Sequence, residues 1–176
     1  MHELADDCDG HDILISIVNF RTAGHCIGCL ASLATERRTI TRFRVIVADG
    51  NSGDGSVEAL EAWITSNNYG DWIKVLPLSL NGGFGWAHNQ VMMRALQSDS
   101  PPAYIHLLNP DTVVEPGAVL ALRSAFDRDR QIGCVGSQMI NMKRGLQPAG
   151  FRLANIRTEF ARGAHTHILI RLLFSR

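Results

Sequence analysis

Polar residues that could contact a ligand occur at four places in this chain, each directly after a run of apolar residues. Asp and Gly are frequent turn residues, so each place alone is compatible with an ordinary turn. Carboxylates are acceptors that also suit hard cations, and glycines permit close backbone approach by a ligand. The four segments are Asn19–Arg21, Asp49–Asp54, Asn81–Asn89 and Asn109–Asp111.

The elements that must position these residues are strands and helices in alternation. Short, continuous, β-branched runs predict strands buried on both faces, and apolar stripes at helical spacing predict the helices between them. Thr22 is available as a helix N-cap, and Pro116 suits a first helical turn. The predicted strands are 13–19, 43–49, 73–78, 104–109 and 132–140, and the predicted helices are about 22–38, 56–65, 86–97 and 116–127.

This alternation predicts an α/β fold with a mainly parallel sheet and helices on both faces. Ligands of such sheets bind at the carboxyl ends of the strands, where all four polar segments fall. We expect an N-terminal tail over residues 1–12, one domain over 13–150 and an incomplete C-terminal segment over 151–176, where the periodicity weakens.

Composition favours a globular protein without nucleic acid as a partner. The 176 residues are 45% hydrophobic, and 17 basic residues balance 17 acidic ones. No run reaches the roughly 20 apolar residues that span a bilayer, and the polar N-terminus is unlike a signal peptide. We therefore expect a cytoplasmic location, and we interpret the four cysteines as thiols.

Four motifs give the chain a resemblance to a known family. They are SIVNF, VADGNSGDGS, NGGFGWAHN and LLNPDT, read in this order along the chain. In this order they resemble the family 2 glycosyltransferases of the GT-A type, from about Ile13 to Phe151. The resemblance implies a Rossmann-like domain that binds a nucleoside diphosphate sugar of the UDP or dTDP type.

The same resemblance implies roles for individual residues. It places Asn19 against the base, and it makes Asp49 an acceptor of hydrogen bonds from the base or the ribose. Further residues of the nucleotide-sugar site would be Asn81, Gly83 and Phe84, with Asn89 supporting their loop.

The segment Asn109-Pro110-Asp111 takes the place of the family's Asp-x-Asp metal motif. By resemblance Asp111 would ligate Mg²⁺ or Mn²⁺, and Asn109 would assist the metal or the diphosphate. The cation would stabilise charge developing on the leaving diphosphate. An Asn in the first position resembles rhamnosyltransferase-like members.

The function implied is transfer of the sugar, with inversion, to a glycan or lipid-linked acceptor in polysaccharide biosynthesis of the cell envelope. Inversion needs a general base for the acceptor hydroxyl. After Asp129 the only carboxylate is Glu159, and no family motif surrounds it, so the catalytic base is unassigned. We therefore expect a truncated enzyme, inactive if the base is missing; the alternative is a non-catalytic nucleotide-sugar-binding remnant.

Other patterns suggest different chemistry. Cys26-x-x-Cys29 is the spacing of a redox motif, but its place on a helical apolar stripe favours core packing, and a zinc site lacks a second ligand pair. The glycines of GGFG follow the third strand, whereas the dinucleotide fingerprint follows the first. We expect His88 on a helix surface and His106 packed in a strand. Trp63, Trp72 and Trp86 are expected in the core or at its rim.

The end of the chain carries an apolar run, Ile168 to Phe174, with arginines nearby. Such a segment is compatible with peripheral contact at the inner face of a membrane, which would suit a lipid-linked acceptor. It is also compatible with a core segment left exposed. The sequence does not predict the oligomeric state.

Overall fold

The first part of the chain is built on a four-stranded parallel sheet. The computed structural model describes residues 12–38, 42–141, 143 and 145–147. The chain divides into two compact units, Met1–Gly133 and Cys134–Arg176. The sheet belongs to the first unit and has the strand order β3-β2-β1-β4, with parallel neighbours throughout. Its strands are β1 (Ile13–Asn19), β2 (Phe43–Asp49), β3 (Ile73–Pro77) and β4 (Tyr104–Leu108).

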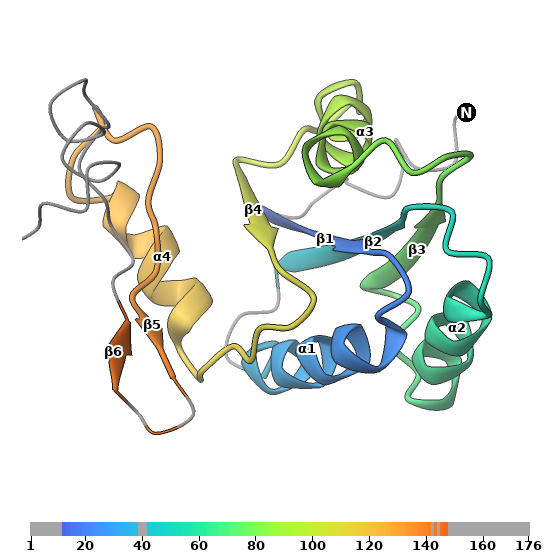
Figure 1. Ribbon diagram of the computed structural model, residues 1–176. Coiled ribbons are helices and arrows are strands. Elements are labelled where there is room, and N and C mark those ends of the chain that lie inside the picture. The colour runs from blue at the N-terminus through green and yellow to red at the C-terminus, as the bar shows by residue number, and fades with distance from the viewer. Residues whose placement is uncertain (1–11, 39–41, 142, 144, 148–176) are drawn as a thin grey trace, which may run out of the picture. The chain divides into compact units, whose positions relative to one another are not determined.

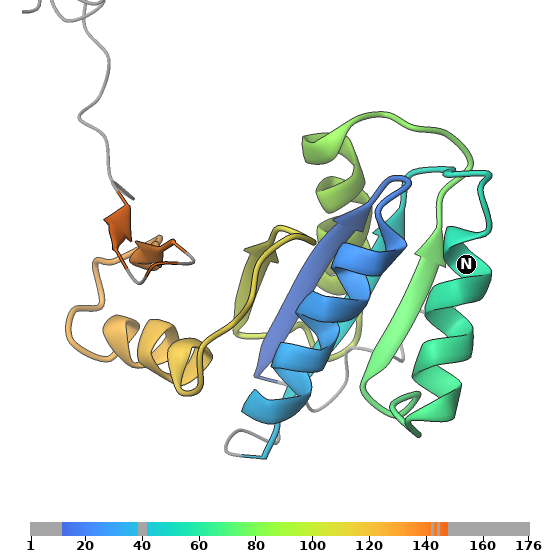
Figure 2. The same ribbon diagram turned by 60° about the horizontal axis from the view of Figure 1, so that its bottom comes forward.

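Helices lie on both faces of this sheet, as Figure 1 shows. One face is covered by α1 (Ala23–Glu36) and α2 (Ser56–Ser66), and the other by α3 (Phe84–Leu96). The view in Figure 2 separates the same layers from a second direction. A fourth helix, α4 (Ala118–Phe126), follows β4. The α/β fold with helices on both faces of a parallel sheet, predicted from the alternation, is confirmed.

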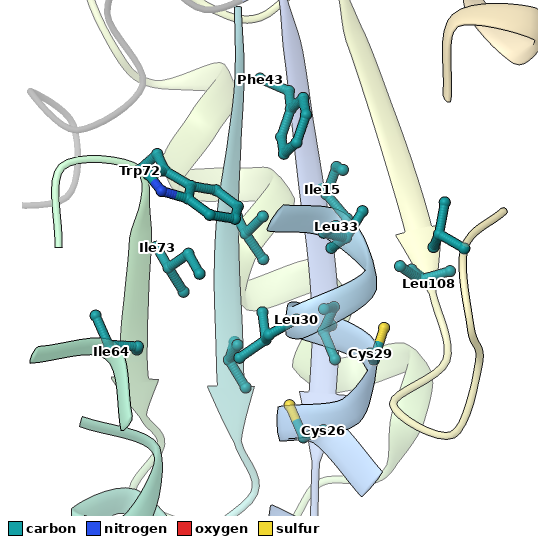
Figure 3. Close-up of a cluster of buried hydrophobic side chains, with 14 of the residues drawn as sticks. Ile15, Cys26, Cys29, Leu30, Leu33, Phe43, Ile64, Trp72, Ile73 and Leu108 are labelled. Atoms are coloured by element: carbon teal, nitrogen blue, oxygen red, sulfur yellow. The ribbon is translucent and has the colours of Figure 1, made fainter. Parts of the chain in front are cut away.

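The larger core lies between the sheet and α1 and α2 (Figure 3). Successive strand residues point to opposite faces, so Ile15 contributes to this core while Leu14 contributes to the other. The stripe Cys26, Leu30 and Leu33 of α1 packs on the strands, and each of these side chains is fully buried. This explains why the strands read as continuous apolar runs, because both of their faces are covered.

The parallel register brings the carboxyl ends of the central strands together. Asn19, the last residue of β1, lies beside Asp49, the last residue of β2, and Asp49 lies beside Pro77 of β3. The polar segments that follow these strands therefore begin at one edge of the sheet, as the sequence predicts.

The predicted strand over residues 132–140 is wrong. Among the described residues of the second unit, only β5 (Met139–Ile140) forms from this run, and it pairs antiparallel with β6 (Leu146–Gln147). Gly133 and Gly136 interrupt the run, and glycine weakens a strand interior. Met139 and Ile140 are also exposed, so in the described part of the unit their side chains gain no burial that would stabilise a longer strand.

Several predictions fall where the structure gives no description. They are the tail over residues 1–11, the segment 151–176, Glu159 and the apolar run Ile168 to Phe174, and all of them lie outside the described residues. Within the described residues, no helix combines the length and the hydropathy needed to cross a lipid bilayer.

Candidate functional site

The ends of β1 and β2 are joined by a buried network around the carboxylate of Asp49. Its Oδ2 accepts hydrogen bonds from Asn19 Nδ2 at 2.7 Å and from Ser52 Oγ at 2.7 Å. Its Oδ1 accepts from the backbone N–H of Ser52 at 2.9 Å. Asp49 and Ser52 are 1% exposed and Asn19 is fully buried. Because buried carboxylates need such partners, these bonds fix the three residues as a unit.

Asn19 extends the network into the start of α1. Its Oδ1 accepts from the hydroxyl of Thr22 at 2.9 Å, so the Thr22 side chain donates to Asn19 and makes no cap bond to the helix. Thr22 occupies the predicted N-cap position. Its side chain makes no capping hydrogen bond with α1, because its hydroxyl donates to Asn19 instead.

The loop after β1 is tied to the loop after β2 through Arg21. Its backbone N–H donates to Ser52 Oγ at 2.9 Å, and its Nε donates to the Ser52 carbonyl at 3.1 Å. Arg21 has φ of 57°, in the left-handed region where a non-glycine residue is uncommon. These bonds hold that conformation. The sequence draws attention to Asn19–Arg21 but gives no sign of this crossing between loops.

The rest of the second loop leads into α2. Asp54 is exposed, and its carboxylate accepts from the hydroxyl of Ser56 at 2.6 Å and from its N–H at 3.0 Å. The hydroxyl bond is the main reason that the pKa of Asp54 lies below its usual value. Asp54 therefore satisfies the first amide of α2, that of Ser56, where Gly55 offers no side chain of its own.

The segment after β3 approaches the same edge. Asn81 Oδ1 accepts from the N–H of Gly83 at 3.0 Å, and a Cβ on Gly50 would lie 3.6 Å from that Oδ1. Gly83, with φ of 86°, precedes α3, which begins at Phe84, two residues earlier than predicted. Phe84 is 53% exposed, so its ring is available at the surface, and Asn89 is also exposed.

His88 is buried, which corrects the prediction of a helix-surface histidine. It is 1% exposed on the face of α3 that packs on the sheet, and its Nδ1 lies 2.8 Å from Ser16 Oγ of β1. Its Nε2 has no hydrogen-bond partner in the described structure, and its ring meets the Phe84 ring edge-on at 4.4 Å. Burial lowers the pKa of His88, so the neutral ring is favoured.

Asn109 and Asp111 lie after β4 and are exposed. The Cys29 thiol donates to the Asn109 carbonyl at 3.7 Å, and the charge of Asp111, after burial, helps raise the pKa of Cys29 to about 12. Burial, followed by the charges of Cys29 and then Asp49, raises the pKa of Cys26 to about 12. The segment that carries Asp111 is thus attached to α1 through the bond between Cys29 and Asn109.

The fit of a divalent cation can be tested on these residues. Among the described residues, no three or more His, Cys, Asp or Glu side chains gather as a metal-binding group. Asp111 offers one exposed carboxylate, and Asn109 can add an amide oxygen. This donor set fits Mg²⁺ or Mn²⁺ if the diphosphate and water supply the remaining oxygens, as is usual for magnesium sites with phosphate substrates.

Cys26 and Cys29 are core residues, as the helical stripe predicts. Both are buried free thiols, and burial raises the pKa of each to about 12. Reactive cysteines have depressed pKa values, so these two have the properties of packing residues. Trp72 is buried and Trp63 and Trp86 are partly buried, in agreement with the core or rim positions predicted for them.

The comparisons with known proteins point to one family. Residues 20–172 match the family model described as glycosyl transferase family 2. No similar sequence was found among curated proteins.

Solved structures share the fold. The mannosyltransferase PcManGT from Pyrobaculum calidifontis, in complex with GDP-Man and Mn²⁺, has a TM-score of 0.58 at 14% identity, over 77% of this chain and 37% of that one. S. aureus TarS 1-349 has a TM-score of 0.53 at 19% identity, over 68% and 33%. Its complex with UDP-GlcNAc gives 0.52 at 18% identity, over 68% and 32%.

This chain therefore spans about a third of the length of these solved structures. At such identities the likeness establishes the fold, which is the GT-A type of α/β domain expected from the motifs. The family assignment comes from the sequence model, which matches far more than half of the chain. On that match, this protein belongs to glycosyl transferase family 2.

Proposed function

We propose that this chain binds a nucleoside diphosphate sugar, of the UDP or dTDP type, as the donor part of a glycosyltransferase. The observation that carries the proposal is that β2 and β4 both pair parallel with β1, so Asp49 at the end of β2 and Asp111 just after β4 lie at the same carboxyl edge of the sheet. This is the edge at which open α/β sheets bind ligands. Solved relatives of the fold were crystallised with UDP-GlcNAc, UDP and GDP-Man, which supports a nucleotide sugar here.

The nucleoside is proposed to lie against Asn19, Asp49 and Asn81. A carboxylate has about four acceptor sites, and the network uses one on Oδ1 and two on Oδ2 of Asp49. One site on Oδ1 is left for a donor of the base or the ribose. Gly83 and the exposed ring of Phe84 would line the same region.

The diphosphate is proposed to lie beyond the nucleoside, toward Asn109 and Asp111, which follow β4. When Mg²⁺ or Mn²⁺ is bound there, it supplies a Lewis acid that offsets the charge of the leaving diphosphate. The role of Asp111 is to hold the cation, and that of Asn109 is to donate or accept at the diphosphate. The Mn²⁺ in the mannosyltransferase complex supports a divalent cation for this type of fold.

The finer features follow the family resemblance, except membrane contact, which follows the apolar run Ile168 to Phe174. They are inversion at the sugar, a glycan or lipid-linked acceptor, a role in cell-envelope polysaccharide, peripheral contact with the inner face of a membrane, and a rhamnosyltransferase-like donor preference from Asn109-Pro110-Asp111. The base that accepts the acceptor's proton is unassigned, so nucleotide-sugar binding without transfer is an outcome that the experiment must separate.

The test is calorimetric titration of the 176-residue chain with UDP and with dTDP, each with and without Mn²⁺. Asp111→Ala should remove the metal-dependent part of the affinity, while Glu115→Ala, an exposed carboxylate four residues further on, should keep it. Mutation of residues that only orient metal ligands costs roughly 10–100-fold in metal affinity, so loss of a ligand itself should cost about 100-fold or more.

Hydrolysis of the donor, in which water accepts the sugar, is then assayed with the nucleoside diphosphate sugar that corresponds to the nucleotide bound. Metal-dependent binding with sugar release supports a glycosyltransferase. Binding without release supports a donor-binding protein alone. Absence of binding by both nucleotides would contradict the proposal.

A further inference from the structure

Three side chains on one face of α1 hold the chain segment that follows β4. The Cys29 thiol donates to the Asn109 carbonyl, Ser32 Oγ accepts from the N–H of Val114 at 2.9 Å, and Glu36 accepts from two further amides. Positions 29, 32 and 36 are three and four residues apart, so they lie on the same side of a helix.

Glu36 makes the strongest of these attachments. Its Oε2 accepts from the N–H of Gly117 at 2.6 Å, and its Oε1 accepts from the N–H of Val119 at 2.9 Å. Both amides belong to the start of α4, whose N-cap residue is Gly117, with φ of 85° and no side chain to cap with. The carboxylate of Glu36, which is 1% exposed, caps α4 from another helix.

These attachments hold the backbone on both sides of Asp111. Asn109 is held on its N-terminal side, and Val114, itself buried, is held on its C-terminal side. The N–H of Thr112 also donates to the Asn109 carbonyl at 3.3 Å, which closes a turn around Asp111. The exposed carboxylate is therefore carried by a backbone fixed from behind by α1.

We propose that Glu36, together with Ser32, is a positioning residue that holds Asp111 where a cation and the donor diphosphate can use it. This rests on the proposed function, because the benefit is to metal-dependent donor binding. A cap that acts on α4 alone would stabilise that helix and leave Asp111 unaffected. The two roles differ in how far the effect of losing Glu36 spreads toward Asp111.

The first test uses Glu36→Ala, Glu36→Gln and Ser32→Ala in the nucleotide titrations. Glu36→Ala should weaken the Mn²⁺-dependent affinity for the bound nucleotide about 10-fold, the effect typical of residues that orient metal ligands. The metal-free affinity, which depends on the Asn19 and Asp49 end, should be unchanged. Glu36→Gln keeps an oxygen for one of the two amides and should restore part of the loss. Glu61→Ala, an exposed glutamate of α2, is the matched control.

The second test needs no ligand, so it separates this inference from the proposed function. Amide hydrogen exchange in Glu36→Ala should speed up at residues 117–119 and also at 111–114, while the amides of residues 49–52 keep their protection. Faster exchange confined to 117–121, or equal weakening of the metal-free and metal-dependent affinities, would overturn the positioning role. If the wild-type chain binds neither nucleotide, the proposed function fails, and the exchange pattern still decides whether Glu36 orders the Asp111 segment.

Discussion

The two carboxylates at the carboxyl edge of the sheet have opposite surroundings. Asp49 is 1% exposed and accepts three hydrogen bonds from Asn19 and Ser52, whereas Asp111 is exposed and only the backbone around it is attached to α1. Three acceptor sites of Asp49 are filled within the folded chain before any ligand arrives, and one site on Oδ1 remains. The Asp111 end has unused acceptor capacity. The comparison teaches that a change at Asp49 should act on folding as well as on nucleotide binding, whereas a change at Asp111 should act on ligand affinity with little effect on folding.

The largest effect on stability is expected from Asp49→Ala. The substitution leaves the amide of Asn19 and the N–H and hydroxyl of Ser52 without their acceptor in a buried place. Each unsatisfied buried group costs about 1–3 kcal/mol, so the free energy of unfolding should fall by roughly 3 kcal/mol or more. Urea unfolding followed by circular dichroism measures this, with Asp99→Ala in an exposed loop as the control. A loss below about 1 kcal/mol would remove the contrast between the two ends.

A smaller effect is expected from protonation of His88. Burial lowers its pKa in the folded chain, so between that lowered value and the unfolded value, about 6.5, the unfolded chain binds more protons. Stability is therefore fully present above pH 6.5 and is lost as the pH falls below it. The urea midpoint should drop between pH 7.5 and pH 5.5.

The variant His88→Asn should show less of this drop, because it removes the titrating ring. Burial also lowers the pKa of His106, so some dependence on pH should persist. His25→Asn, at an exposed site of α1, is the control for the substitution itself. An identical drop in wild type and His88→Asn would refute the assignment.

The smallest effect on stability is expected from Asp111→Ala. Substitutions at exposed positions usually change the free energy of unfolding by less than about 0.5 kcal/mol. The same variant should lose metal-dependent nucleotide affinity, so its two measurements should move independently. A thermal midpoint well below that of wild type, without ligand, would mean that Asp111 is part of the folded framework, as Asp49 is.

Most of the sheet could be predicted from the sequence because its strands are buried on both faces. Continuous apolar runs such as residues 13–19 are unambiguous when they end in polar turns. The run 132–140 is also partly apolar, but Gly133 and Gly136 interrupt it. A strand also needs a neighbouring strand and a core, and neither is visible in the composition of the run itself. That is why the prediction failed there.

The residues behind the site were harder to predict. Glu36 lies three residues after Leu33 and so falls on the buried stripe of α1. This spacing is visible in the sequence, but an acidic side chain at a helix end is usually exposed to solvent. His88 shares its stripe with Val91 and Ala95, and small residues of this kind give a weak apolar signal. In both cases the hydrogen-bond partner that offsets the cost of burying the polar side chain comes from a distant segment. For Glu36 the partners are amides of α4, and for His88 the partner is the hydroxyl of Ser16.

The two core thiols of α1 also make it possible to measure how often the core opens, by the rate of thiol labelling. Burial raises the pKa of Cys26 and of Cys29 to about 12, so both stay protonated at pH 7, and both are shielded from reagents. Cys134 is exposed, so we expect it to be labelled first and to mark the start of the reaction. In a chain carrying Cys8→Ser, the later phase of thiol labelling therefore counts openings of the core beneath α1. Mass spectrometry separates chains labelled at one cysteine from chains labelled at three. The rate at which the triply labelled chains appear then measures how often α1 separates from the sheet.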